Sequence, residues 1–108
     1  MDDKYNKKLQ EKIDIKLINF KFYSGKYIVY ENNIKGKEYD GYNNNLLFEG
    51  EYLNGKRNGK GKEYDGHGKL ICEGEYLNDE RNGKGKDYYS NGKLRFEGEY
   101  LNDVRLTG

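Results

Sequence analysis

The stretch Phe48-Glu49-Gly50-Glu51-Tyr52-Leu53-Asn54 occurs in three copies along this chain of 108 residues. It returns as Cys72-Glu73-Gly74-Glu75-Tyr76-Leu77-Asn78 and as Phe96-Glu97-Gly98-Glu99-Tyr100-Leu101-Asn102, each time 24 residues further on. The connecting segments repeat too, because residues 57–62 and 81–86 both read Arg-Asn-Gly-Lys-Gly-Lys. A fixed period of about 20–50 residues indicates a repeat architecture.

Each copy has the alternation of a β-strand. Phe48, Gly50 and Tyr52 are predicted to face one side, and Glu49, Glu51 and Leu53 the other. Asn-Gly steps supply the positive φ angles of tight hairpin turns; they occur at Asn54-Gly55, Asn58-Gly59, Asn82-Gly83 and Asn91-Gly92. The sequence therefore predicts an all-β fold, a single-layer antiparallel meander of hairpin repeats. We expect at least six strands, with turns near residues 54–59, 65–68, 78–83 and 90–92.

Glycines inside predicted strands need a reason, since glycine weakens a strand. We expect Gly50, Gly74 and Gly98 to leave room for an aromatic ring from a neighbouring strand. The candidate rings belong to Tyr52, Tyr76, Tyr100, Tyr64 and Tyr88. Rings lying over glycine would bury apolar area in a sheet that is only one layer thick.

The composition narrows the class of protein. Only 33% of residues are apolar and 36% are charged, which is typical of disordered chains, but 12 Tyr, 4 Phe, no Pro and a strict repeat favour an ordered one. The 20 basic and 19 acidic residues balance to a net charge of +1. This balance argues against a nucleic-acid partner. A single cysteine and no predicted signal peptide or membrane span favour an intracellular location, cytoplasmic or associated with the cytoskeleton or a membrane.

Residues 49–61, Glu-Gly-Glu-Tyr-Leu-Asn-Gly-Lys-Arg-Asn-Gly-Lys-Gly, resemble the MORN (membrane occupation and recognition nexus) repeat. The resemblance covers residues 25–108, with a degenerate copy at 25–47, copies at 48–71 and 72–95, and a partial copy at 96–108. Tyr replaces the family's usual second aromatic residue, Trp. The run at residues 89–94 is similar to variant repeats of protists and bacterial antitoxin-like proteins. The family implies an elongated β-meander used for scaffolding, dimerisation and protein docking, with phospholipid contact proposed for some members.

The two ends depart from the repeat. Residues 1–24 are expected to form a cap or a partner-binding handle, with a short helix whose apolar stripe holds Tyr5, Leu9 and Ile13. At the other end, the strand Arg95 to Asn102 is predicted to be an open sheet edge that presents Phe96, Gly98 and Tyr100. Either the tail after Asn102 folds back over this edge, or another chain, such as a second copy, pairs with it. The short tail favours a partner.

The sequence holds no candidate catalytic site, metal site or cofactor site. His67 is expected to be a solvated turn residue, and Cys72 a small core residue at the position of Phe48 and Phe96. The glutamates recur with the repeat, which favours a role on the sheet face over acid–base chemistry. These features predict a protein that is not an enzyme.

One candidate surface is a recurring basic row: Lys56, Arg57, Lys60, Lys62, Arg81, Lys84 and Lys86. The row is a candidate for binding a partner or acidic phospholipid headgroups. It is alternatively expected to pair across strands with the recurring glutamates, which the near-zero net charge favours. The leading prediction is a non-catalytic protein-interaction or scaffolding module, and the alternative is peripheral phospholipid binding. A glycan or choline binder is a third class, disfavoured by the absence of Trp and of a secretion signal.

Overall fold

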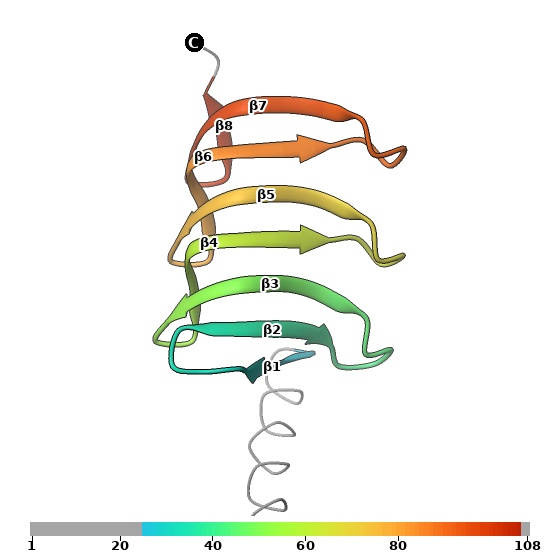
Figure 1. Cartoon of the computed structure of the whole chain (residues 1–108), viewed down its shortest axis with the longest axis vertical. Helices are drawn as coiled ribbons and strands as arrows, with labels where there is room; N and C mark the ends of the chain where they lie inside the picture. The colour runs from blue at the N-terminus through green and yellow to red at the C-terminus, as the bar shows by residue number, and fades with distance from the viewer. Residues whose placement is uncertain (1–24, 107–108) are drawn as a thin grey trace, which may run out of the picture.

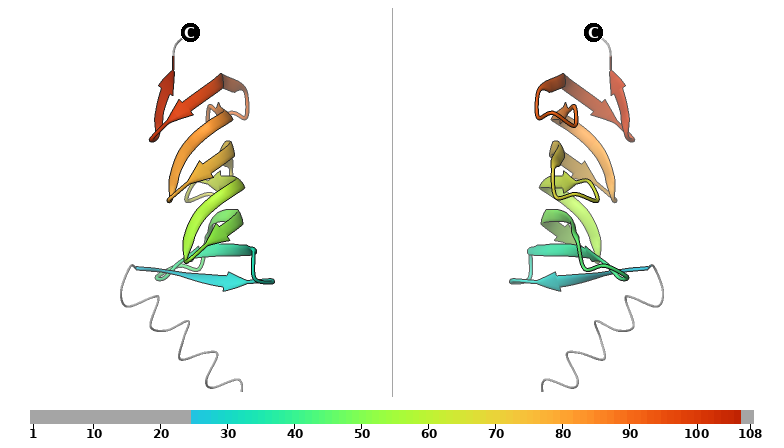
Figure 2. Two further views of the ribbon diagram at one scale, coloured as in Figure 1. Left: turned by 90° about the vertical axis from the view of Figure 1, so that its left-hand side faces the viewer. Right: turned by 90° about the vertical axis from the view of Figure 1, so that its right-hand side faces the viewer.

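In the computed structural model, residues 25–106 form one antiparallel sheet of eight strands that lie in chain order (Figure 1). The strands are β1 (Lys26–Tyr30), β2 (Lys35–Asp40), β3 (Leu46–Leu53), β4 (Lys56–Tyr64), β5 (Leu70–Leu77), β6 (Glu80–Tyr88), β7 (Leu94–Leu101) and β8 (Val104–Leu106). Side views show the hairpins stacked along one axis (Figure 2). The predicted all-β meander is confirmed. The helix predicted within residues 1–24 lies outside the described residues.

From β3 onward, the strands are connected by tight turns at one of their ends and by longer loops at the other. Asn54 and Gly55 connect β3 to β4 with φ angles of 53° and 78°, which is the all-positive pattern of a type I′ hairpin turn. The next tight turns use Asn78-Asp79 and Asn102-Asp103, also with positive φ. Turns were predicted near residues 65–68 and 90–92, and the structure has loops there, at the ends of the strands opposite the tight turns (Figure 1).

Two Asn-Gly steps that were predicted to be turns lie inside strands instead. Asn58-Gly59 is part of β4 and Asn82-Gly83 is part of β6. Here the register to the preceding strand shifts by a β-bulge, and Gly59 and Gly83 adopt φ of 111° and 107°. A positive φ is common to hairpin turns and to bulges, so the dipeptide alone does not distinguish them.

Six glycines are cross-strand partners in an unbroken ladder through β2–β7: Gly36, Gly50, Gly61, Gly74, Gly85 and Gly98. On one face, aromatic rings lie against members of this ladder. A Cβ on Gly61 would overlap the Phe48 ring, and a Cβ on Gly85 would lie 2.9 Å from Cε1 of Tyr100. The predicted ring-over-glycine packing therefore exists.

The glycines that accommodate the rings are largely not the predicted ones. At Gly50 and Gly74, an added Cβ would collide first with the backbone of the paired glycine's strand, because neighbouring backbones approach closely there. Gly98 does lie beneath a ring, but the ring is that of Phe96 in its own strand. Phe48, which was not among the candidate rings, supplies the most buried ring of the sheet, at 0% exposure.

Gly61→Ala is expected to destabilise the protein by about 1–3 kcal/mol, since the new methyl group displaces the buried Phe48 ring. Gly66→Ala is the matched control, because nothing lies within 4 Å of a Cβ at that turn position. Urea unfolding of both variants measures the difference. Equal midpoints for the two variants would contradict the packing of Phe48 on Gly61.

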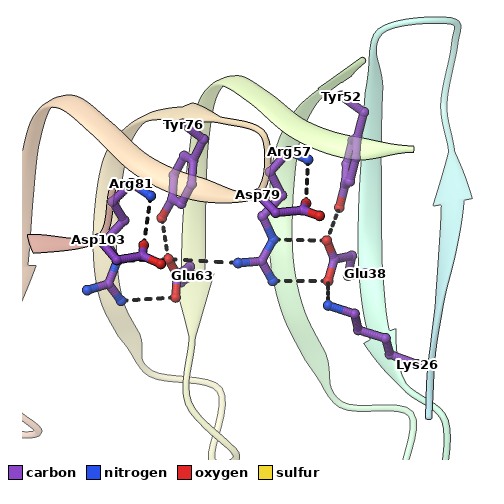
Figure 3. A network of polar contacts seen from close by, with 9 residues as sticks. All are labelled: Lys26, Glu38, Tyr52, Arg57, Glu63, Tyr76, Asp79, Arg81 and Asp103. Atoms are coloured by element: carbon purple, nitrogen blue, oxygen red, sulfur yellow. Dashed lines mark hydrogen bonds and ion pairs between the residues drawn. The ribbon is translucent and has the colours of Figure 1, made fainter. Parts of the chain in front are cut away.

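A repeating polar cluster lies on the same face as the rings (Figure 3). The Tyr52 hydroxyl donates to Glu38 Oε1 at 3.0 Å, and the Arg57 guanidinium donates to both Glu38 oxygens at 2.9 and 3.0 Å. One repeat later, Tyr76 and Arg81 make the same bonds to Glu63. Each carboxylate thus joins a tyrosine and an arginine from following strands.

The tight turns also connect successive repeats. The Arg57 backbone N–H donates to Asp79 Oδ1 at 2.7 Å, and the Asp79 N–H donates back to the Arg57 carbonyl at 3.0 Å. Arg81 and Asp103 repeat this exchange at 2.8 and 2.9 Å (Figure 3). These reciprocal bonds fix the stacking distance of the hairpins along the axis.

The third copy of the polar cluster is incomplete. Asp87 replaces the glutamate and accepts bonds from Tyr100 at 2.6 Å and Arg105 Nε at 2.8 Å. Its other oxygen, Oδ1, is buried without a hydrogen-bond partner and has only a long ion pair with Arg95 Nε, at 4.0 Å. The shorter side chain therefore satisfies only one of its two oxygens.

Asp87→Glu is expected to stabilise the protein by about 0.5–1.5 kcal/mol, because the longer side chain reproduces the two-oxygen contact of Glu38 and Glu63. The reverse change, Glu63→Asp, is expected to destabilise it. Thermal unfolding of both variants tests this pair. A loss of stability in Asp87→Glu would contradict the explanation that the shorter side chain leaves Oδ1 without a hydrogen bond.

The sheet does not end where the sequence predicted. Val104–Leu106 adds β8, which pairs with Glu99–Leu101 of β7. The tail therefore folds back over the second half of β7, which is one of the two predicted alternatives. Tyr100 lies in this half and is only 3% exposed. The first half of β7, which includes Phe96 and Gly98, pairs with β6 on one side and with no strand of residues 25–106 on the other.

Candidate functional site

The face opposite the rings carries a groove of about 1060 Å³ that crosses strands β2–β7. Every residue that lines it is Gly, Glu or Lys. Its floor is the glycine ladder, and its sides are the residues before and after the glycines of β3–β7, such as Glu49 and Glu51 around Gly50, together with Lys35 before Gly36. These side chains point away from Phe48 and Tyr52 because successive residues of a strand face opposite sides. We call this feature the charged groove.

Two rows of side chains run along the charged groove, and in each row the charge changes sign at every strand. One row is Lys35, Glu51, Lys60, Glu75, Lys84 and Glu99. The other row is Glu49, Lys62, Glu73, Lys86 and Glu97, and Lys37 of β2 continues it beyond the groove lining. Each strand therefore carries two residues of the same sign, and its neighbours carry the opposite sign.

The groove glutamates are held by the chain itself. The Tyr64 and Tyr88 hydroxyls donate to Glu49 and Glu73 at 2.5 Å in both cases. Glu51 and Glu75 accept the backbone N–H of Lys60 and Lys84 at 2.7 Å in both cases. These bonds fix the four carboxylates along the groove.

The tyrosine contacts also shift the titration of the two hydroxyls. Partial burial and the bond to Glu49 raise the pKa of Tyr64 to about 12. The bond to Glu73, with partial burial, raises the pKa of Tyr88 to about 12. Both hydroxyls therefore remain protonated donors at neutral pH.

The groove lysines are less engaged than the glutamates. Lys86 forms an ion pair with Glu97 at 3.9 Å. The side chains of Lys60, Lys62 and Lys84 form no ion pair with any residue in the described range 25–106. Three ammonium groups are thus placed beside fixed carboxylates and remain open to a ligand.

The structure separates the basic row predicted from the sequence. Lys60, Lys62, Lys84 and Lys86 lie together in the charged groove. Arg57 and Arg81 lie on the opposite face, bound to Glu38 and Glu63. Lys56 is exposed beside the β3–β4 turn. The alternation of Lys60, Gly61 and Lys62 indicates the groove face, but the arginines' acidic partners come from other repeats and carry no local sequence signal.

The candidate edge residues are separated in the same way. Tyr100 is buried in the aromatic face, and Gly98 belongs to the groove floor. Phe96 packs edge-on against Tyr100, with ring centroids 5.4 Å apart. The three residues therefore do not form one exposed patch.

The described residues offer little for catalysis. His67 is exposed in the β4–β5 loop, and Cys72 is 1% exposed, with burial raising the pKa of its thiol. Residues 25–106 contain no group of three His, Cys, Asp or Glu side chains that could hold a metal ion. In the same range, no helix has the length and apolarity needed to cross a membrane.

Residues 48–68 and 72–93 match the family model of the MORN repeat. The two matches begin at Phe48 and Cys72, which start successive copies of the repeat. No curated protein shows a significant match to the chain.

Proposed function

Because this chain is a MORN repeat protein, we propose that it is a non-catalytic docking module that holds a partner protein in its charged groove. Repeat arrays commonly use one extended face for binding while the rest of each unit maintains the stack. In this proposal the aromatic face has the structural role and the groove face has the binding role.

The observation that carries the proposal is the unequal use of the basic residues. Arg57 and Arg81 are engaged with carboxylates of their own chain, whereas Lys60, Lys62 and Lys84 have no internal ion-pair partner among the described residues. All three lysines line a groove of about 1060 Å³. A groove that crosses six strands and is lined only by Gly, Glu and Lys fits a polypeptide segment better than a single small molecule, because small-molecule sites are mostly apolar.

Affinity capture from native extract, with the full chain as bait and both proteins and lipids scored, tests the proposal. The double variant Lys60→Gln plus Lys84→Gln is expected to lose the captured protein, because two open charges of the groove are removed. Lys93→Gln is the matched control, since Lys93 is exposed and lies outside the groove. Capture of the same proteins by all three baits would contradict docking in the groove.

Acidic phospholipid is the competing ligand for these lysines. Sedimentation with acidic vesicles is expected to show weak binding at physiological ionic strength, because glutamates alternate with the lysines and screening acts over about 8 Å. Tight vesicle binding that falls with salt and with Lys60→Gln plus Lys84→Gln would favour a membrane-surface role instead.

A further inference from the structure

The charge pattern of the groove has a defined spatial period. Both rows change sign at each of the six strands β2–β7, and neighbouring strands lie about 4.8 Å apart. Like charges therefore recur after two strands, or about 9.6 Å. A ligand that complements the groove must present opposite charges with the same period.

An α-helix that lies across the strands meets this requirement. One helical turn advances about 5.4 Å, so an acidic turn followed by a basic turn returns to the same sign after about 10.8 Å. The mismatch is about 0.6 Å per strand, or about 1.5 Å to either side of the centre across six strands. Lysine and glutamate side chains are long enough to absorb this difference.

An extended peptide does not meet it. Residues of an extended chain that face the same side are about 6.6 Å apart, which exceeds the strand spacing by about 1.8 Å and adds up to about 4.5 Å to either side of the centre across six strands. In polyproline II only one residue per turn faces a given side, about every 9.3 Å, so charges of the opposite sign would face away from the groove. A helix of about 10 Å diameter also spans both rows at once, since residues two apart on a strand are separated by about 7 Å.

Strand alternation places a row of exposed leucines next to the charges, beside the groove lining and not within it. Leu53, Leu77 and Leu101 are 58%, 49% and 51% exposed, and each follows the buried tyrosine of its repeat. They recur at every second strand, which matches an apolar residue at every seventh position of a helix, about 10.5 Å apart. The row therefore provides an apolar margin for the same ligand.

We infer that the partner segment is an α-helix that lies across the strands in the charged groove, with alternating acidic and basic turns and an apolar residue at every seventh position. Its acidic turns face the lysines of β2, β4 and β6, and its basic turns face the glutamates of β3, β5 and β7. Its apolar residues contact Leu53, Leu77 and Leu101. This inference rests on the proposed docking function and specifies the class of partner.

Three fluorescent peptides of equal length test the inference against the full chain by anisotropy at physiological ionic strength. The first alternates acidic and basic turns with leucine at every seventh position. The second has the same composition and leucine positions, but its acids fill one half and its bases the other. The third is the first peptide with a central proline that breaks the helix. Circular dichroism verifies that the first two are helical.

The alternating peptide is expected to bind about tenfold more tightly than the block peptide and the proline peptide. Lys60→Gln plus Lys84→Gln and, separately, Leu77→Ala are expected to weaken its binding, whereas Lys93→Gln leaves it unchanged. Equal binding of the alternating and block peptides, or tight binding of the proline peptide, would overturn the helical partner.

The outcomes of this test are distinguishable from failure of the docking function. If no peptide binds while Lys60→Gln plus Lys84→Gln still abolishes capture of a protein from extract, the helical partner is overturned and docking stands. If the groove variant captures the same proteins as Lys93→Gln, the docking function itself is overturned, and the helical partner with it.

Discussion

Phe48→Ala is expected to lower the free energy of unfolding by about 3–5 kcal/mol. The Phe48 ring is 0% exposed and lies on Gly61, where no other side chain can fill the space that it would leave. It packs edge-on against Tyr52 and Tyr76, with centroid distances of 5.7 and 5.0 Å, and the Arg57 guanidinium lies 4.2 Å from its centre. One truncation therefore removes contacts that connect two successive repeats.

Phe96→Ala is the matched control for this prediction. Phe96 occupies the same position in the last copy of the repeat, but it is only partly buried and its stacked arginine is farther away, at 5.4 Å. Its loss is expected to cost less than that of Phe48. Urea unfolding followed by far-ultraviolet circular dichroism measures both values, and a larger effect of Phe96→Ala would contradict the packing described for Phe48.

Glu38→Ala is expected to destabilise the protein by about 3 kcal/mol, because it leaves the largely buried guanidinium of Arg57 with only its longer ion pair to Glu63, at 3.8 Å. Glu38 is 1% exposed, and it also accepts the Tyr52 hydroxyl and an ion pair from Lys26 at 3.1 Å. Glu31→Ala is the control, since its ion pair with Lys37 is 3.7 Å long and solvent-exposed. Such a pair contributes about 0–1 kcal/mol. Equal destabilisation by the two changes would contradict the structural role of Glu38.

The same carboxylates determine the expected dependence of stability on pH. Burial alone would raise the pKa of Glu38, but Arg57 and Lys26 hold the pKa below its usual value of 4.5. Burial likewise opposes Arg81 and Tyr76 at Glu63, and the net effect is again a lowered pKa. A lowered folded-state pKa stabilises the protein above the ordinary pKa, and this contribution is lost as pH falls through the folded value.

Acid titration of the unfolding free energy tests this sign. Stability is expected to be flat from neutral pH to about pH 5 and to fall below the ordinary glutamate pKa. The fall is expected to be smaller in the Glu38→Ala variant, which lacks one of the two titrating groups. A wild-type protein that gains stability below pH 4.5 would contradict the ion pairs of Glu38 and Glu63.

Much of the fold follows from local patterns in the sequence. Alternation within residues 48–54 assigns Phe48 and Tyr52 to one face and the glutamates to the other, and the structure confirms this division. The repeat spacing and the Asn54-Gly55 turn predict a meander, in which the strands lie side by side in chain order. These features were predictable because strand alternation and tight turns depend on residues that are adjacent in sequence.

The features that were missed depend on residues far apart in sequence. Whether Arg57 lies in the basic surface or beside Glu38 depends on a bulge that shifts the register of β4, and the Asn58-Gly59 step at that bulge is equally typical of a turn. The pairing of Gly50 with Gly61 likewise decides which glycine lies beneath a ring. Register across strands is a three-dimensional property, so the site's charge alternation became visible only with the strand pairings.

In the proposed function, the groove face, and not the loops or the aromatic face, contacts the partner protein. Photo-cross-linking from defined positions measures this directly, with a photoreactive phenylalanine analogue in place of Lys62 in the groove or of Tyr42 in a loop, where Tyr42 is 92% exposed. The captured partner is expected to cross-link from position 62 and not from position 42. Cross-linking from position 42 alone would contradict it.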